Sequence, residues 1–330
     1  MNPYLFVGLV VVLAWTYDLY NGMNDAANAI ATSVSTRALT AAQAISLAWL
    51  FNIVGAFLTT AVAKTIGKGI VDPALVDQGV WIGALVGAIL WSAFCTRRGI
   101  PISITHALVG GIGGAAVTGY GVDILKWSGL AKVFIWLVVS PVVGFVVAYV
   151  FMLGVYWLFR KVRPSRANRF FRYGQILSAS FMAFAHGSND TQNAMGMITA
   201  ALVAAGFLSD FRVLTWVIFG SAFFMGLGTA LGGWRVIRTL GMRMAKIDPP
   251  QGFSAETAGA LSIIFATLVG APISTTQVVS TAVMGVGATQ RFSAVRWGIA
   301  RDIVLTWVLT FPGSALGAAL VYVLVRPLFV

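Results

Sequence analysis

A short polar motif occurs twice in this chain, each time inside one of its two longest apolar segments. Asn24-Asp25-Ala26-Ala27-Asn28 lies within 4–36, and His186-Gly187-Ser188-Asn189-Asp190-Thr191-Gln192-Asn193 lies within 174–206, about half the chain later. In a helix, side chains three and four positions apart share a face, so each copy directs one carboxylate and two carboxamides toward one point. Placing a carboxylate at the centre of a membrane helix raises the free energy of insertion by roughly 2.5–3.5 kcal/mol. Two carboxylates at matching positions therefore predict a function, and we expect it to be cation binding.

The composition places these motifs in a membrane. Hydrophobic residues make up 58% of the 330 residues and charged residues only 10%, and the mean hydropathy is +0.87. Apolar segments recur at or above the roughly 20 residues that cross a bilayer, which predicts an all-α integral membrane protein surrounded by lipid. The basic residues behind the formal net charge of +12 lie in loops between these segments, so nucleic acid is not an expected partner.

A second repeat follows the first. Two short apolar pairs, 80–96 with 101–120 and 254–270 with 272–288, are each joined by a turn that contains proline. The stretch Pro-Ile-Ser-x-Thr begins at Pro101 and again at Pro272. The order of acid motif, span, proline hairpin and long span therefore occurs twice. We predict a first transmembrane repeat at 1–159, a basic linker at 160–173 and a second repeat at 174–330. The long motif-bearing segments are expected to be broken or strongly tilted helices.

Charge in the loops predicts the orientation. The linker carries six basic residues and no acid, so it should be cytoplasmic, as should the loop with Arg235, Arg238, Arg243 and Lys246. Both termini then lie outside, and each half crosses the membrane an odd number of times, so the second half is inverted. Inverted repeats with interrupted helices are typical of secondary transporters in the plasma (inner) membrane, which bind substrate near the midplane.

The hairpins predict an anion site. A proline in the first turn of a half-helix, followed by hydroxyl side chains beside free backbone N–H groups, forms an anion cradle. The alternative is that each Pro-Ile-Ser-x-Thr stretch only caps a helix, and its double occurrence argues against that. The predicted anion ligands are Ser103, Thr105, His106, Ser274, Thr275, Thr276 and Gln277.

The acid motifs predict cation sites. Asp25 and Asp190 are candidate ligands for a small cation such as sodium, together with Asn24, Asn28, Asn189 and Asn193 and with carbonyls freed by a helix break. Glu256, at the start of the second hairpin, is a third candidate acid, with a role as an interfacial acid as the alternative. A structural role is favoured for His186, with proton transfer or a hydrogen bond to the substrate as the alternatives. Neither histidine has the spacing of a zinc site. No cofactor is expected beyond the coupling ion.

Together, these motifs resemble the inorganic phosphate transporter (PiT) family, and the resemblance covers essentially the whole chain. It implies a phosphate symporter driven by sodium ions or protons, with phosphate on the hairpin hydroxyls and cations on the Asn-Asp motifs, and it implies a homodimer. The chain departs from many relatives in having Gln277 where they carry histidine, and from some in having Asn52 where they carry glutamate. The family also includes sulfate permeases.

The expected function is therefore secondary active import of inorganic phosphate, and not enzymatic catalysis. The nearest alternative is a sulfate permease of the same architecture. A membrane-embedded phosphohydrolase using His186 or His106 is disfavoured, because the sequence shows no compact pair of nucleophile and base. A passive anion channel is the third alternative.

Overall fold

The structure is a bundle of helices, seen in a computed structural model that describes residues 3–240, 244 and 247–328. In chain order the α-helices are α1 (Pro3–Ser35), α2 (Ala41–Gly55), α3 (Ala61–Gly69), α4 (Gln78–Arg98), α5 (Ile104–Tyr120), α6 (Trp127–Phe159), α7 (Pro164–Ala204), α8 (Thr215–Leu231), α9 (Trp234–Arg238), α10 (Pro249–Leu268), α11 (Thr275–Ala288) and α12 (Trp297–Val325).

The bundle has the inside-out polarity of a membrane protein. Its outer helices present large apolar side chains, such as Val138 on α6 and Leu320 on α12, with exposed fractions of 69% and 68%. The acids and carboxamides of the two motifs are buried instead. Within the described residues, α1, α4, α6 and the segment 297–328 are long and apolar enough to cross a bilayer. The predicted all-α membrane fold is confirmed.

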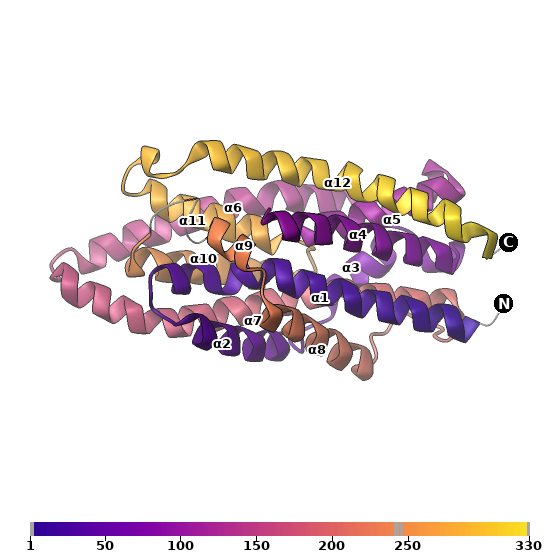
Figure 1. Cartoon of the computed structure of the whole chain (residues 1–330), viewed down its shortest axis with the longest axis horizontal. Helices are drawn as coiled ribbons and strands as arrows, with labels where there is room; N and C mark the ends of the chain where they lie inside the picture. The colour runs from indigo at the N-terminus through magenta and orange to yellow at the C-terminus, as the bar shows by residue number, and fades with distance from the viewer. Residues whose placement is uncertain (1–2, 241–243, 245–246, 329–330) are drawn as a thin grey trace.

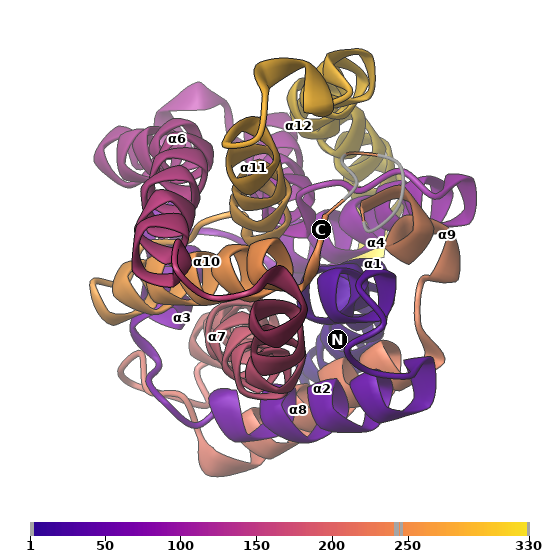
Figure 2. The same ribbon diagram turned by 90° about the vertical axis from the view of Figure 1, so that its left-hand side faces the viewer.

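The same order of helices occurs in both halves, and the halves are intertwined. Both termini lie at one end of the molecule and the α6–α7 connection at the other, so α1 and α7 run in opposite directions (Figure 1). Viewed along this axis, α1 and α7 lie near the middle (Figure 2). The outer helix α12 packs on hairpin α4–α5, and α6 packs on hairpin α10–α11. Each half therefore covers the hairpin of the other.

Two local predictions differ from the structure. The motif-bearing helices α1 and α7 are continuous through their motifs, so the predicted helix breaks are wrong and free no carbonyls. Helix α7 begins at Pro164, so most of the predicted linker 160–173 is helical. Of the predicted basic loop, Arg243 and Lys246 lie outside the described residues.

The hairpin tips are held by glycine and serine. Gly99 and Gly270 have φ angles of 70° and 66°, in the left-handed region that disfavours side chains with a Cβ. Ser103 and Ser274 then cap α5 and α11, each accepting a hydrogen bond from the backbone N–H three residues later. The prolines lie in the connecting turn, two residues before each cap, and not in the first helical turn as predicted.

Candidate functional site

The tips of the two hairpins meet the Asn-Asp motifs in the middle of the bundle. Each motif's first asparagine binds the hairpin of its own half. Asn24 Nδ2 donates to Thr96 Oγ1 at 2.8 Å, and Asn189 Nδ2 donates to Thr267 Oγ1, also at 2.8 Å. These bonds hold the last turns of α4 and α10 against α1 and α7. Breaking either one would leave a buried amide without a hydrogen-bond partner, which is unfavourable.

Each motif's second asparagine reaches across to the hairpin of the other half. Asn28 Nδ2 donates to Thr275 Oγ1 at 3.2 Å and to Thr276 Oγ1 at 3.0 Å. Asn193 Nδ2 donates to Thr105 Oγ1 at 3.0 Å. The site is therefore assembled from four segments that are distant in the sequence, and both motifs contact both hairpins.

The two acids of the motifs come together at this crossing. Thr276 Oγ1 donates to Asp25 Oδ1 at 2.9 Å, and Thr275 Oγ1 donates to Asp190 Oδ2 at 2.8 Å. One ligand atom from each of Asp25, His186 and Asp190 lies within 4.8 Å of the others. Both hydroxyls that bind the acids come from the second hairpin. The first hairpin has Ile104 at the position equivalent to Thr275, and its Thr105, equivalent to Thr276, accepts from Asn193 instead. The two halves thus contribute unequally.

Several oxygens in the site are free to bind a ligand. The carboxamide oxygens of all four asparagines and Asp190 Oδ1 are buried, and none has a hydrogen-bond partner among the residues that the structure describes. Buried acceptors without donors are unfavourable unless a ligand satisfies them. Carboxamide and carboxylate oxygens are the ligands of hard cations, so this set fits the predicted cation site. The asparagines are Asn24, Asn28, Asn189 and Asn193.

His186 is oriented by a chain of hydrogen bonds. The Thr229 hydroxyl donates to the Met225 carbonyl at 3.1 Å and therefore accepts from Asn52 Nδ2 at 2.9 Å. Asn52 Oδ1 then faces His186 Nδ1 at 3.0 Å as an acceptor, which places the ring proton on Nδ1. His186 Nε2 lies 3.3 Å from Asp190 Oδ2. With the ring proton on Nδ1, Nε2 faces this carboxyl group and is a candidate ligand atom beside it.

Glu256 lies in a separate buried polar cluster. It accepts hydrogen bonds from Thr32 Oγ1 at 2.6 Å, from Gln175 Nε2 at 3.3 Å and from the Ser178 hydroxyl. Thr32 follows Asp25 by seven residues on α1, about 10 Å along the helix. Glu256 is thus buried and not an interfacial acid.

Two predicted anion ligands lie elsewhere. The His106 ring stacks on Phe311 with ring centroids 4.6 Å apart, and neither ring nitrogen has a hydrogen-bond partner within the described ranges. The His106 and Gln277 side chains line an apolar cavity of about 670 Å³ between α6 and α12. The structure therefore does not bring these two side chains to the cluster around Asp25 and Asp190.

Comparison with known proteins agrees with this arrangement. A model of the phosphate transporter family matches residues 21–318. The chain belongs to this family. The transporter is 45% identical to a probable low-affinity inorganic phosphate transporter of Rhizobium meliloti (strain 1021), over 96% of each chain. It is 43% identical to a protein of the same description from Bacillus subtilis (strain 168), over 97% of each chain.

A solved structure described as the sodium-dependent phosphate transporter is similar to this fold, with a TM-score of 0.88 and 26% identity. The match covers 98% of this chain and 99% of that chain. The predicted resemblance to a family of membrane phosphate transporters is confirmed. The relatives and the fold are those of transporters and not of enzymes, which removes the phosphohydrolase alternative.

Sequence reasoning missed several partners in the transporter's site. Thr96 and Thr267, which bind the first asparagines, each lie five positions before a hairpin proline and so occupy equivalent places in the two repeats. Aligning the repeats could therefore have found them. Asn52 was noted only as a departure from the family pattern, and its contact with His186 joins helices α2 and α7. No local spacing reveals such a contact.

Proposed function

We propose that the transporter imports inorganic phosphate by symport with sodium ions or protons, and that phosphate binds near the midplane between the two hairpin tips. One observation carries this proposal: hydrogen bonds join both motif acids, Asn28 and the hydroxyls of Thr275 and Thr276 into one buried cluster drawn from both halves. Anion donors and cation ligands are therefore neighbours in a site closed to water.

Coupling follows from the charges. None of the buried residues in the described part of the chain is a lysine or arginine. Phosphate entering the site would meet two carboxylates whose ligand atoms lie within 4.8 Å of each other. Like charges repel strongly in a site of low dielectric constant, whereas a bound cation or proton removes that repulsion. Phosphate binding thus requires the coupling ion, and this requirement makes the transporter a symporter and not a passive channel.

The residues divide into two sets by their chemistry. Phosphate would bind to hydroxyls at the N-termini of α5 and α11, where helix dipoles add positive potential. Coupling cations would bind to the carboxylates and the free carboxamide oxygens, and Glu256 would hold a separate cation. The proposed phosphate ligands are Ser103, Thr105, Ser274, Thr275 and Thr276, and the cation ligands of the central site are Asn24, Asp25, Asn28, Asn189, Asp190 and Asn193.

The proposed orientation places the basic α6–α7 connection in the cytoplasm and both termini outside, at opposite ends of the bundle (Figure 1). The plasma membrane is the proposed location. The homodimer implied by the family resemblance stays a prediction, which the mass of the detergent-solubilised particle would test.

Uptake into proteoliposomes tests the function. Labelled phosphate should accumulate saturably under an inward sodium or proton gradient, and the gradient that drives it identifies the coupling ion. Unlabelled phosphate should compete more effectively than sulfate, and the reverse order would show a sulfate permease. Absence of saturable uptake under either gradient would refute the proposal.

Variants test the cation assignment. Asp25→Asn and Asp190→Asn each remove a charge but keep an oxygen, and each should abolish gradient-driven uptake. Asp302→Asn is the control, because Asp302 is an exposed acid on α12 that pairs with its neighbour Arg301. Normal coupled uptake by both motif variants would show that the assignment is wrong.

A further inference from the structure

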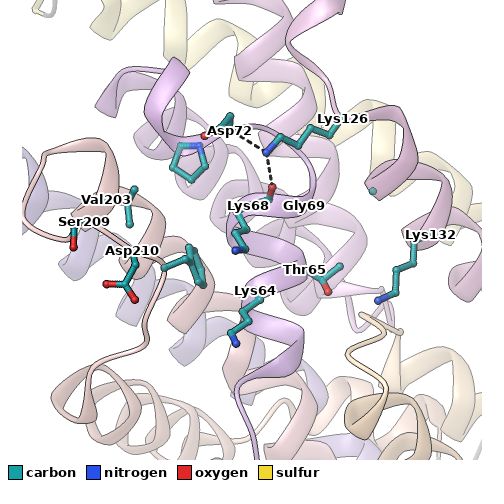
Figure 3. Close-up of a pocket in the computed structure, with 13 residues that line it drawn as sticks. Lys64, Thr65, Lys68, Gly69, Asp72, Lys126, Lys132, Val203, Ser209 and Asp210 are labelled. Atoms are coloured by element: carbon teal, nitrogen blue, oxygen red, sulfur yellow. Dashed lines mark hydrogen bonds and ion pairs between the residues drawn. The ribbon is translucent and has the colours of Figure 1, made fainter.

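A pocket of about 570 Å³ opens at the end of the molecule where the termini lie. Helix α3 contributes Lys64 and Lys68, and the first turns of α6 contribute Lys126 and Lys132. Asp72 and Asp210 are the acids in its lining. Figure 3 shows these side chains arranged around the pocket. The lining thus carries a net positive charge of two.

Only part of this charge is neutralised. Lys126 Nζ lies 2.9 Å from Asp72 Oδ2 and also donates to the Lys68 carbonyl. The hydrogen bond from Lys126 lowers the pKa of Asp72 below its ordinary value, so the pair is ionised at neutral pH. Lys64 and Lys132 are exposed and have no ion-pair partner in the part of the chain that the structure describes. Lys68 also has no ion-pair partner within the described residues, but its Nζ lies 5.9 Å from the centroid of the Phe211 ring. Lys64 and Lys132 are therefore the two amines most available to an anion.

The pocket lies directly behind the tip of the second hairpin. Thr65, which lines it, donates its hydroxyl to the Gly270 carbonyl at 2.8 Å. The next carbonyl, that of Ala271, lies 3.5 Å from Asn189 Nδ2 in the central site. Gln192, between Asn189 and Asn193 on α7, caps α3 by accepting from the N–H groups of Val62 and Ala63. Helix α3 therefore joins the pocket to the second motif and hairpin.

The first hairpin has a related arrangement toward the other end of the bundle. Thr239, which follows α9, donates to the Gly99 carbonyl at 3.0 Å, as Thr65 does to Gly270. Arg235 of α9 donates to the Arg97 carbonyl beside it. Basic residues behind both tips indicate that these positions serve the anion and not only the local packing.

We propose that the lysine-lined pocket is an outer anion site, in which inorganic phosphate binds before it passes the tip of the second hairpin. This inference rests on the proposed function. Lys64 and Lys132 supply positive charge at the membrane surface, where hydration keeps the free-energy cost of a charge low. This charge raises the local concentration of hydrogen phosphate. The central site can then remain free of basic side chains.

Transport kinetics test the site. In proteoliposomes at about 0.01 M ionic strength, Lys64→Gln and Lys132→Gln should each raise the KM for phosphate about three- to fivefold, and the double variant about tenfold, with kcat unchanged. Raising ionic strength with choline chloride at constant sodium and pH should bring the wild-type KM toward that of the variants. Lys161→Gln removes one charge at the opposite end and should leave KM unchanged. An unchanged KM in the double variant would overturn the proposal.

A labelling experiment detects binding without transport. Cys95, the only cysteine of the chain, is buried, so Ser209→Cys introduces a single accessible thiol in the pocket lining. Inorganic phosphate should slow its reaction with a membrane-impermeant thiol reagent at least threefold, and chloride should not. The double variant Lys64→Gln/Lys132→Gln should abolish this protection.

The two experiments separate the two proposals. Wild-type uptake without protection of the Ser209→Cys thiol by phosphate would refute the outer site and leave the transport function intact. Protection without uptake would support the anion site while refuting the symporter. Labelling only from the cytoplasmic face would also overturn the outer placement of the pocket.

Discussion

The two hairpins should respond unequally to loss of equivalent hydroxyls. Thr105 and Thr276 occupy matching positions, each the fourth after its hairpin proline. Thr105 accepts one hydrogen bond, from Asn193. Thr276 accepts from Asn28 and also donates to Asp25 at 2.9 Å. We predict that Thr276→Val lowers kcat/KM for phosphate uptake much more than Thr105→Val does.

The magnitude follows from the bonds that are lost. A neutral hydrogen bond contributes about 0.5–1.5 kcal/mol, which predicts a loss of about 2- to 13-fold for Thr105→Val. A hydrogen bond to a carboxylate contributes about 1.5–3 kcal/mol, so Thr276→Val should lower kcat/KM by a further factor of about 10 to 150. The additional loss arises because the buried Asp25 carboxyl group loses its donor.

The assay is initial uptake of labelled phosphate into proteoliposomes, normalised to inserted protein, with the coupling ion at saturation. Thr276→Ser keeps the hydroxyl and should retain kcat/KM within about threefold of the wild type. Thr118→Val is the matched control, because the exposed Thr118 hydroxyl donates only within its own helix, to Gly114. Equal losses in Thr105→Val and Thr276→Val would refute the inferred asymmetry.

Three further predictions concern residues around the site. Glu256→Gln keeps the shape of the side chain but removes its charge, so the coupling-ion concentration for half-maximal uptake should rise at least about tenfold; an unchanged ion dependence would exclude a cation there. Asn52→Leu removes the acceptor that orients His186 and should lower kcat about tenfold, whereas Asn52→Asp should not; normal uptake by the leucine variant would contradict this role. The Asp72–Lys126 pair should stabilise the fold above the ordinary aspartate pKa of about 3.9 and lose that effect as pH falls through the lowered pKa of Asp72. The melting temperatures of wild type and Lys126→Gln should therefore converge between about pH 5 and pH 3, and a constant difference would argue against the pair.

Much of the site could be predicted because the repeats are visible in the sequence. The spacing of Asn24, Asp25 and Asn28 requires a shared helix face, and the repeated Pro-Ile-Ser-x-Thr predicts paired hairpins. The prediction of broken helices failed because a polar motif inside a long apolar segment does not by itself interrupt the backbone hydrogen bonds of a helix. In the structure, α1 and α7 keep their backbone hydrogen bonds through both motifs, and the free oxygens of the motifs are those of the side chains.

The sequence by itself determined the all-α membrane fold and predicted two repeats and the residue types of a site, because hydropathy and helical periodicity are local properties. Only the tertiary structure decided which motif meets which hairpin. Asn28 lies 247 residues from Thr275, and no local spacing predicts that hydrogen bond. His106 is a second example. Its neighbour Thr105 accepts a hydrogen bond from Asn193 in the site, whereas the His106 ring packs on Phe311 of α12. Adjacent helical residues face different directions, and the packing of distant helices decides what each one contacts.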